Sequence, residues 1–541
     1  MDAKLPVKKF PFWWLLITIP AGIHFFLLYR YSVNAPRLDD FSDGFGFLTH
    51  FYQTDSLQEK VDWFFSRYQN HRWGFLHAIY AAYHCIDFRS ANFLSMPWLL
   101  LLLWLWHRAT HNTPYHAALL ICASFLIFNL HSWTGMFWIT ASLAAFPSIP
   151  LALLAFMLAM YREAWALISA IAISLLATFT NGNGVFIWLL VIGHLIFLQI
   201  KSPDHRRWFF IAVWIVIAIP TLSAFFSDWI FHPVNTQEDR VAGFAQKLLE
   251  NPLLFIKGLF ATIGSNLIYY PKQDTDWQVI LAIAMGITES IAMMWLLLTG
   301  ALRKNPPLLL LTLYIGGTMA AIAASRVLFI GLHQAFQGHY KLYNSMFLLL
   351  LCTAWLDKYY SAKKNTANTF IYAATGASIF LYLASLVIFI PAVDHYHREL
   401  VSDTKNWLYT NKLTRGESQL FVKQPNQKLL TAVAGGFYNP WTLLNDQEIP
   451  RDIIYTGHCP TALLAVPAKL QSQQRALAVH IEATLPARTE KFCLQGSQQA
   501  IYFARPASDN STDIDNNITL WVPRNSEVTD DAGPWTLYAL P

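Results

Sequence analysis

Charged residues are scarce in this sequence. They make up 13% of its 541 residues, whereas soluble domains usually contain about 25%. Hydrophobic residues account for 55% and aromatic residues for 15%. This balance argues against an ordinary soluble protein and indicates a chain that crosses a lipid bilayer many times. The net charge of +5 requires no nucleic-acid partner, because most Lys and Arg residues lie in short loops between apolar runs.

The sequence also lacks a cleavable signal peptide. Its first apolar run, residues 11–31, is too long for one and has no small-residue cleavage site. Cysteine is sparse, with five residues in all. Three of them are expected to be apolar packing in or beside membrane spans. Cys459 and Cys493 would be able to pair in an oxidising compartment, although a single pair of cysteines is weak support.

Long apolar runs, in contrast, are abundant. A run of about 20 apolar residues is long enough to cross a bilayer as a helix. The stretch 253–270 is expected to be an interfacial or re-entrant helix, because counting it as a span would place Arg303, Lys304 and Lys358 outside the cytoplasm. We predict roughly eleven transmembrane helices, at residues 12–31, 91–107, 115–131, 141–160, 164–180, 184–200, 208–227, 277–300, 307–328, 342–357 and 367–392.

Basic residues are distributed unevenly between the loops. The short loops around 131–141 and 181–184 contain no Lys or Arg. Because cytoplasmic loops are enriched in these residues, the pattern predicts a multi-pass inner-membrane protein with a cytoplasmic amino terminus and with residues 32–90 and 393–541 outside. The cytoplasmic segments would then carry Lys4, Lys8, Lys9, Arg108, Arg162, Lys201, Arg206, Arg207, Arg303, Lys304, Lys358, Lys363 and Lys364.

The character of the chain changes after about residue 393. Short runs typical of strands, namely ALAVHIEATL, AIYFARPA, ITLWVP and WTLYALP, are separated there by Pro, Gly, Asn and Asp. We therefore predict an α-helical transmembrane domain at 1–392, with a first external loop at 32–90, and a small β-rich periplasmic domain at 393–541.

The strongest chemical signal directly follows the first span. The sequence there is Asn34-Ala-Pro-Arg-Leu-Asp39-Asp40-Phe41-Ser-Asp43. A carboxylate just outside a membrane helix is able to take a proton from an attacking hydroxyl, which is general-base catalysis. Its neighbour would hold the acceptor or shift the first group's pKa by like-charge repulsion. The alternative is a solvated acidic turn, but the position beside the first span favours a functional role.

This arrangement resembles the GT-C-fold glycosyltransferases, the superfamily of protein mannosyltransferases and lipid A aminoarabinose transferases. Three further segments over residues 1–360 are similar to an uncharacterised bacterial branch of it: Gln69-Asn-His-Arg72, Thr178-Phe-Thr-Asn-Gly-Asn-Gly184, and Arg326 with Gly331, Ala335 and Tyr340. The sequence departs from the branch in having Asn-His-Arg instead of Glu-His-Arg, and Gly338-His339-Tyr340 instead of Ser-Arg-Tyr.

The resemblance implies an inverting enzyme of the bacterial inner membrane. Its donor would be a polyprenyl-phosphate-linked sugar, and its acceptor a glycan, lipid or protein on the periplasmic side. The resemblance makes Asp39 the candidate base and Asp40 its partner. It also suggests donor or acceptor binding by Arg326, His71, Arg72, His339 and Lys341. No cofactor is expected to be required, although a divalent cation held by Asp39 and Asp40 is left open.

Other interpretations exist for most of these residues. Arg326 at a span end would be able to extend to the interface, and His71 and Arg72 would also fit a solvated face of an amphipathic helix from 58 to 84. A metal site of His71, His77 and His84 is disfavoured because their spacings do not bring all three to one helix face. The turn at 181–184 is expected to be an ordinary tight turn instead of a phosphate cradle.

Two other functions compete with glycosyl transfer. A transporter or flippase of lipid-linked glycans should show paired halves and charged or broken helices near mid-bilayer, and the sequence shows no second half that resembles the first. A scaffold protein that binds cell-wall partners through its terminal domain would leave the placement of Asp39 and Asp40 unexplained.

Overall fold

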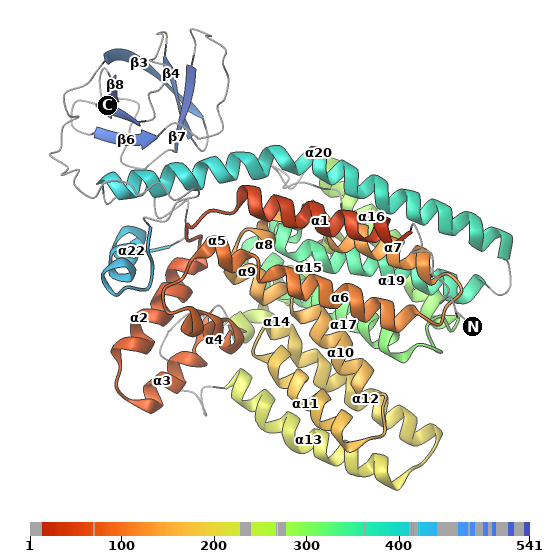
Figure 1. The fold of residues 1–541 in the computed structure, drawn as a ribbon. Helices are drawn as coiled ribbons and strands as arrows, with labels where there is room; N and C mark the ends of the chain where they lie inside the picture. Colours follow the sequence, from red (N-terminus) through yellow and green to blue (C-terminus); the bar gives the residue numbers. More distant parts are fainter. Residues whose placement is uncertain are drawn as a thin grey trace, which may run out of the picture. The chain divides into compact units, whose positions relative to one another are not determined.

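The computed structural model describes residues 13–68, 71–227, 240–266, 268, 277–360, 364–410, 413, 415, 420 and 422–440, together with the backbone of six strands between residues 464 and 540. Within these residues the chain is mostly helical (Figure 1). Its contacts divide it into two units. The helical unit comprises residues 1–30, 55–79 and 92–390, and the second unit comprises residues 31–54, 80–91 and 391–541.

The first half of the chain is built from short helices around the first loop and from longer apolar helices after it. In order, its elements are α1 (Trp13–Tyr31), the π-helix η1 (Asp40–Gly44), α2 (Phe45–Gln53), α3 (Leu57–Phe64), β1 (Arg67–Tyr68), β2 (His71–Arg72), α4 (Gly74–Tyr83), α5 (Phe88–Asn92), α6 (Ser95–Thr110), α7 (His116–Ile127), η2 (Leu130–Ser132), α8 (Trp133–Met136), α9 (Ile139–Ala145), α10 (Ser148–Leu158), α11 (Ala164–Thr178), η3 (Gly182–Gly184), α12 (Val185–Lys201) and α13 (His205–Phe226).

The second half contains more long helices and ends in strands. Its elements are α14 (Arg240–Glu250), α15 (Pro252–Gly264), α16 (Trp277–Leu298), α17 (Pro306–Ile322), the π-helix η4 (Ala323–Val327), α18 (Leu328–Ile330), η5 (Leu332–Phe336), η6 (Gly338–Tyr340), α19 (Lys341–Tyr359), α20 (Lys364–Thr410), α22 (Pro425–Ala434), β3 (Leu464–Gln473), β4 (Ala476–Ile481), β5 (Lys491–Gln495), β6 (Ala500–Ala504), β7 (Ile518–Pro523) and β8 (Trp535–Leu540).

Nine helical segments in the described part of the chain are long and apolar enough to cross a membrane, so the chain is a polytopic helical membrane protein. All nine coincide with predicted spans. They are Trp14–Tyr31, Phe88–Thr110, His116–Met136, Ile139–Leu158, Gly182–Lys201, His205–Phe226, Trp277–Leu298, Pro306–Ile330 and Asn365–Val401.

The other two predicted spans are helices that fall short of this standard. Helix α11 has 15 residues, which corresponds to roughly 22 Å at the usual helical rise and is less than the ~30 Å of a hydrocarbon core. Helix α19 is long enough, but it contains Lys341, Asp357 and Lys358. The stretch predicted as interfacial or re-entrant forms α15, whose 13 residues are also too few to cross a bilayer.

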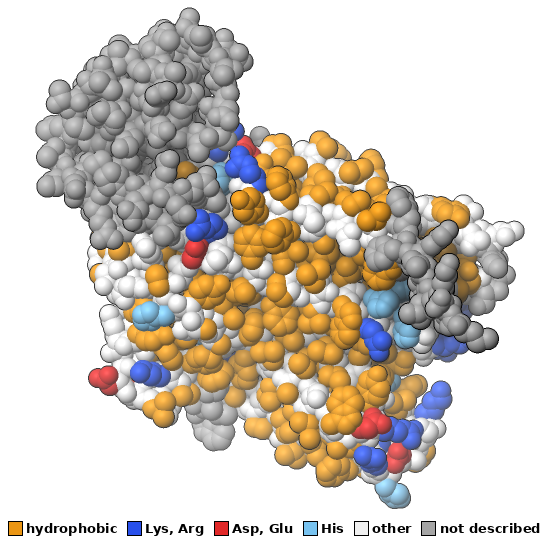
Figure 2. Space-filling view, viewed as in Figure 1, with side chains coloured by type: hydrophobic (Ala, Val, Ile, Leu, Met, Phe, Trp, Pro, Cys, Tyr) orange, Lys and Arg blue, Asp and Glu red, His pale blue; other side chains and the backbone are white. Residues whose placement is uncertain are grey.

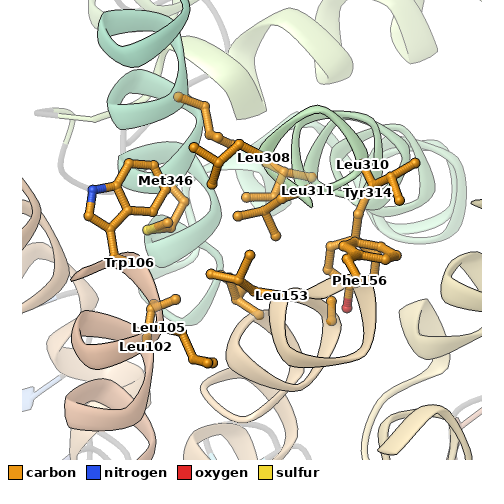
Figure 3. Packing of buried hydrophobic residues seen from close by; sticks show 14 of the residues in the cluster. Leu102, Leu105, Trp106, Leu153, Phe156, Leu308, Leu310, Leu311, Tyr314 and Met346 are labelled. Carbon is orange, nitrogen blue, oxygen red and sulfur yellow. The ribbon is translucent and has the colours of Figure 1, made fainter. Parts of the chain in front are cut away.

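The interior of the helical unit is filled by apolar side chains from α6, α10, α17 and α19 (Figure 3). Trp106, Phe156, Leu311 and Met346 are among those with no exposed surface. Lipid tails are as apolar as these side chains, so close packing and internal hydrogen bonds hold such helices together in a bilayer. On the outside, Figure 2 shows hydrophobic side chains over a broad face of the molecule, as a lipid-facing surface requires.

Helices α15 and α16 approach each other unusually closely. A Cβ atom added to Gly264 would lie 2.1 Å from the carbonyl oxygen of Ala282, and one added to Gly286 would lie 1.9 Å from that of Phe260. Small residues at these positions therefore allow backbone-to-backbone contact, which is a common device of membrane helices. The contact holds the buried end of α15 inside the helical unit.

The second unit contains residues 31–54, which include the acidic loop at 34–43, together with residues 80–91 and the carboxy-terminal segment from residue 391. Between residues 391 and 440 its described residues are largely helical, whereas the sequence suggested β structure from 393 onward. The strands follow later and pair in the order β6-β5-β8-β3-β4-β7, with every neighbouring pair antiparallel. The predicted bridge from Cys459 to Cys493 stays a prediction, because Cys459 lies outside the described residues.

The α15–α16 contact yields a test of the packing. Replacing Gly264 by Ala should destabilise the protein by about 1–3 kcal/mol, the usual cost of overpacking a core, because backbone atoms of α16 block the new methyl group. Gly316→Ala is the matched control, since no atom lies within 4 Å of its added Cβ. Thermal unfolding in detergent should show a lower Tm for Gly264→Ala alone. Equal melting temperatures would contradict the close contact.

Candidate functional site

The two adjacent acids of the first loop occupy different environments. Asp40 is 1% exposed. Its Oδ2 accepts a hydrogen bond from the backbone N–H of Arg37 at 2.9 Å, and its Oδ1 accepts one from the hydroxyl of Tyr80 at 3.1 Å. Asp39 is only half-buried and directly precedes the π-helix η1. The surroundings of Asp40 therefore fix its carboxylate, while that of Asp39 is the more accessible of the two.

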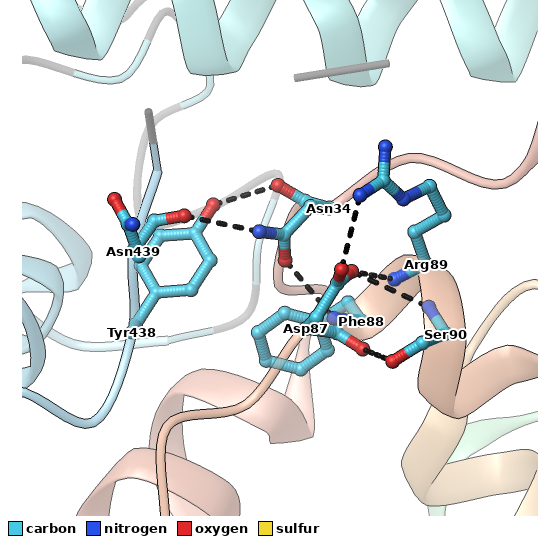
Figure 4. Close-up of polar contacts among 7 residues, drawn as sticks. All are labelled: Asn34, Asp87, Phe88, Arg89, Ser90, Tyr438 and Asn439. Atoms are coloured by element: carbon cyan, nitrogen blue, oxygen red, sulfur yellow. Dashed lines mark hydrogen bonds and ion pairs between the residues drawn. The ribbon is translucent and has the colours of Figure 1, made fainter. Parts of the chain in front are cut away.

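Asn34 connects this loop to two other segments of the second unit (Figure 4). Its Oδ1 accepts from the backbone N–H of Phe88 at 3.0 Å, and its Nδ2 donates to the carbonyl oxygen of Asn439, also at 3.0 Å. The hydroxyl of Tyr438 donates to the backbone oxygen of Asn34 at 2.7 Å. Asn34 and Tyr438 are both buried, and burial raises the pKa of Tyr438. This network holds the start of the acidic loop against the carboxy-terminal segment.

Two basic residues of the second unit make contacts at the same loop, one from within it and one from α22. The guanidinium carbon of Arg37 lies 4.5 Å from the ring centre of Tyr396, a cation–π contact. The Nζ of Lys428, in the first turn of α22, lies 3.0 Å from the hydroxyl of Ser42, and burial lowers the pKa of Lys428. The contact between α22 and the acidic loop was not predictable from sequence, because nearly 400 positions separate Ser42 from Lys428.

A buried ion pair stabilises the carboxy-terminal part of this arrangement. The Nε and Nη2 of Arg415 lie 2.9 and 2.8 Å from Oδ2 of Asp403, and the backbone N–H of Arg415 donates to Oδ1. Burial alone would lower the pKa of Arg415, but the charges of Asp403, Glu399 and Tyr396 and the hydrogen bond to Asp403 together outweigh burial and raise that pKa. Both residues also line a small cavity of about 10 Å³ against Ala35, Pro36 and Phe41 of the acidic loop.

In the helical unit, His71 and Arg326 lie together. His71 belongs to the short strand β2, not to a helix as one interpretation proposed, and its ring stacks on Trp73 with 5.7 Å between centres. Its Nε2 lies 3.3 Å from Nη2 of Arg326, which comes from the π-helix η4. Its Nδ1 lies 3.3 Å from the backbone nitrogen of Gly182 in the turn before α12. Single-turn π-helices are frequent at functional sites.

Arg72 has a structural set of partners. It is 1% exposed, and its guanidinium donates to the carbonyl oxygens of Phe225, Phe65 and Ser227 at 3.1, 2.7 and 3.0 Å. Phe225 lies in the last turn of α13, and Ser227 is the carboxy-terminal cap of that helix. Arg72 therefore caps a helix end. A role in binding donor or acceptor stays a prediction. The neighbouring Gln69 and Asn70 of the same motif lie outside the described residues.

Lys341 is also buried, at 1% exposure. Its ammonium donates to the carbonyl oxygen of Ser265, the residue that caps the carboxy-terminal end of α15. The Nδ2 of Asn344 donates to the Ser265 hydroxyl at 2.7 Å, and the ring of Phe336 lies 5.5 Å from Lys341 Nζ.

His339 lies in η6, just before Lys341. Its ring makes an edge contact with Trp138 at 5.6 Å, and its backbone packs against Gly135. The turn at 181–184 connects α11 to α12, and Nδ2 of Asn183 in this turn donates to the hydroxyl of Tyr343 at 3.0 Å.

The seven predicted site residues fall into two groups. Asp39 and Asp40 belong to the second unit, and the five binding candidates belong to the helical unit.

No three His, Cys, Asp or Glu side chains form a group that could hold a metal ion in the part of the chain that the structure describes. No family model matches this chain, and no curated protein matches it. The resemblance to GT-C glycosyltransferases therefore rests on the sequence motifs alone.

The buried ion pair of the second unit provides a test of local stability. Asp403→Asn should reduce the free energy of local opening by about 3–5 kcal/mol, because it leaves the Arg415 charge buried and unpaired. Asp394→Asn is the control on the same helix. It breaks the partly exposed pair with Arg398 and should cost no more than about 1 kcal/mol. Hydrogen exchange of peptides covering 396–410 measures both, and similar small effects would contradict the assigned role of the pair.

Proposed function

We propose that this protein is an inverting membrane glycosyltransferase. It would move a sugar from a polyprenyl-phosphate carrier to a glycan, lipid or protein acceptor on the periplasmic side of a bacterial inner membrane. The observation that best supports this proposal is the contrast between Asp39 and Asp40. One carboxylate is accessible and its neighbour is buried and fixed by two hydrogen bonds, directly after an apolar helix.

In the proposed reaction, Asp39 accepts the proton of an acceptor hydroxyl. The hydroxyl oxygen attacks the anomeric carbon from the face opposite the carrier phosphate and forms the new glycosidic bond. The bond from the anomeric carbon to the phosphate oxygen breaks, and its electron pair stays on the released polyprenyl phosphate. General-base assistance of this kind is typically worth about 10²–10⁴ in rate. Arg326 would balance the negative charge of the phosphate, because a guanidinium binds phosphate oxygens through paired hydrogen bonds.

Asp40 would act as a positioning residue. Its hydrogen bonds to Arg37 and Tyr80 determine the backbone course of the loop and hence where Asp39 points. Asp40 is also 1% exposed, so an acceptor hydroxyl would reach it less easily than it would reach Asp39. This supports Asp39 over Asp40 as the proton acceptor.

One observation favours the transporter alternative. Glu289 lies inside the apolar helix α16 and is 9% exposed, and its Oε2 has no hydrogen-bond partner among the described residues. Ionisable residues within membrane spans are typical of transport pathways. The two functions have different products, because a transporter leaves the sugar attached to its lipid whereas a transferase releases polyprenyl phosphate.

The proposal includes an orientation, with eleven crossings that place residues 32–90 and the β-rich segment in the periplasm. Cysteines introduced at Ser56, Asn112, Ser202 and Ser508 in a background without native cysteines should be labelled from outside only at Ser56 and Ser508. Ser202 is the decisive position, because it is cytoplasmic if the short α11 carries the chain across and periplasmic if it does not. Labelling of Ser508 from the cytoplasmic side would contradict the orientation.

The catalytic proposal has a direct test in cells. A deletion strain should lose one surface sugar and accumulate its lipid-linked form, which mass spectrometry detects. The wild-type protein should restore the sugar, and Asp39→Asn should restore less than about 1% of it, because the substitution removes the basic lone pair while keeping the size of the side chain. Asp55→Asn, an exposed acid of the same loop, is the control. Full restoration by Asp39→Asn at normal protein level would exclude Asp39 as the base.

A further inference from the structure

The helical unit has an open groove where α19 meets the start of α20. Its volume is about 520 Å³, which is within the usual range of roughly 300–1,000 Å³ for sites that bind small molecules. Four of the α20 residues in its lining are exposed, so the groove opens to the outside of the unit. The lining consists of Trp355 from α19 and of Asn365, Thr366, Thr369, Phe370 and Ala373 from α20.

The lining of this groove changes from polar to apolar along α20. Its polar residues Asn365, Thr366 and Thr369 belong to the first two turns of the helix, and the apolar residues follow. The ring of Phe370 stacks on that of Trp355, with 4.0 Å between centres and 24° between planes. Amide and hydroxyl groups therefore line one end of the groove and hydrocarbon lines the other, an arrangement that suits an amphipathic ligand.

Aromatic side chains place the groove at the edge of the apolar layer. A row of ring contacts runs from Trp295 through Tyr359 to Trp355, with centres 6.0 and 5.1 Å apart. Trp and Tyr are enriched where a membrane meets water. The row lies close to the end of the candidate span Trp277–Leu298 and the start of Asn365–Val401. The groove is therefore at the depth where lipid headgroups join their acyl chains.

The apolar end of the groove is continuous with the lipid-facing surface of α20. Further along this helix, Tyr372, Phe380 and Val387 are 78, 65 and 77% exposed. Large apolar side chains exposed along a membrane-spanning helix contact lipid tails. A bilayer lipid beside α20 would thus reach the groove without leaving the membrane.

The charge at this end of the helical unit favours an anionic headgroup. Arg303 and Lys304 are exposed in the turn that follows α16, and Lys358 lies in the last turn of α19. The carboxylate of Asp357 accepts a hydrogen bond from the backbone N–H of Leu302 at 2.7 Å, which holds this turn against the end of α19. Three basic residues and one acid leave an excess of positive charge, and basic clusters at the end of membrane helices attract anionic lipids.

We propose that this groove binds one anionic phospholipid of the bilayer. An acyl chain of the lipid lies against Trp355, Phe370 and Ala373. The ester and phosphate oxygens accept hydrogen bonds from the amide of Asn365 and the hydroxyl of Thr366, both of which are exposed in the lining. The inference goes beyond the proposed function and does not rest on it, because none of these residues takes part in glycosyl transfer.

The experiment titrates dipalmitoyl phosphatidylglycerol into the purified full-length protein in detergent and follows bound lipid by native mass spectrometry. The wild-type protein should hold one lipid more tightly than any further ones. Ala373→Trp should weaken this binding by about 10-fold or more, because the indole overfills the groove. Ala377→Trp is the matched control, since Ala377 is exposed one turn further along α20 and is not part of the lining. Thr366→Val should weaken binding by roughly 2- to 10-fold, the usual effect of losing one hydrogen bond.

Photolabelling locates the bound lipid. A phosphatidylglycerol with a diazirine in its acyl chain should label the peptides that contain residues 355 and 373 in the wild-type protein and in Ala377→Trp. The same peptides should lose most of their label in Ala373→Trp. Each variant is first shown to be monodisperse and to melt like wild type without added lipid, so that a loss of binding is not a loss of fold.

Equal lipid binding and labelling in Ala373→Trp and the wild-type protein would overturn the inference. Equal affinity for dipalmitoyl phosphatidylcholine would contradict an anionic occupant. A dimer that Ala373→Trp dissociates, with no change in bound lipid, would show that a second copy of the chain covers the groove instead of a lipid.

Discussion

Helix ends impose the main constraint on the helical unit. The last carbonyl groups of a helix have no partner within that helix, and a lipid environment offers no water to satisfy them. Basic side chains fill this role repeatedly. Arg72 donates to the end of α13, Lys341 to the end of α15, and Arg207 to the end of α12. A positive charge at a helix carboxy terminus also complements the helix dipole.

This constraint separates the basic residues into two kinds. Arg72 and Lys341 are buried with their donors on backbone carbonyls, so their positions are explained by the fold. Arg326 is half-buried, and its Nη2 lies 3.3 Å from Nε2 of His71 instead of on a helix-end carbonyl. A similar contrast distinguishes the acids, since Asp40 is bound within its loop whereas Asp39 is more accessible. In the proposed mechanism, Asp39 and Arg326 are the residues that carry the chemistry.

Hydropathy predicted the membrane helices well, because about 20 consecutive apolar residues are a strong and local signal. The same signal is weaker for α11, which is shorter, and for α19, which has charged residues at both ends, so these two spans stay predictions. The caps on helix ends were not predictable, because sequence motifs do not show whether a basic residue is buried on a carbonyl. The link from Asn34 to Tyr438 and Asn439 was hidden as well, because it joins segments about 400 residues apart.

The central claim is that the protein breaks the bond between a sugar and its lipid phosphate. The most direct measurement incubates the purified protein with the lipid fraction of cells that lack it and follows the lipids by mass spectrometry. The account predicts that one lipid-linked sugar disappears while an equal amount of polyprenyl monophosphate forms, and that this happens only when acceptor is present. Persistence of every lipid-linked sugar at its starting level, with acceptor supplied, would contradict it.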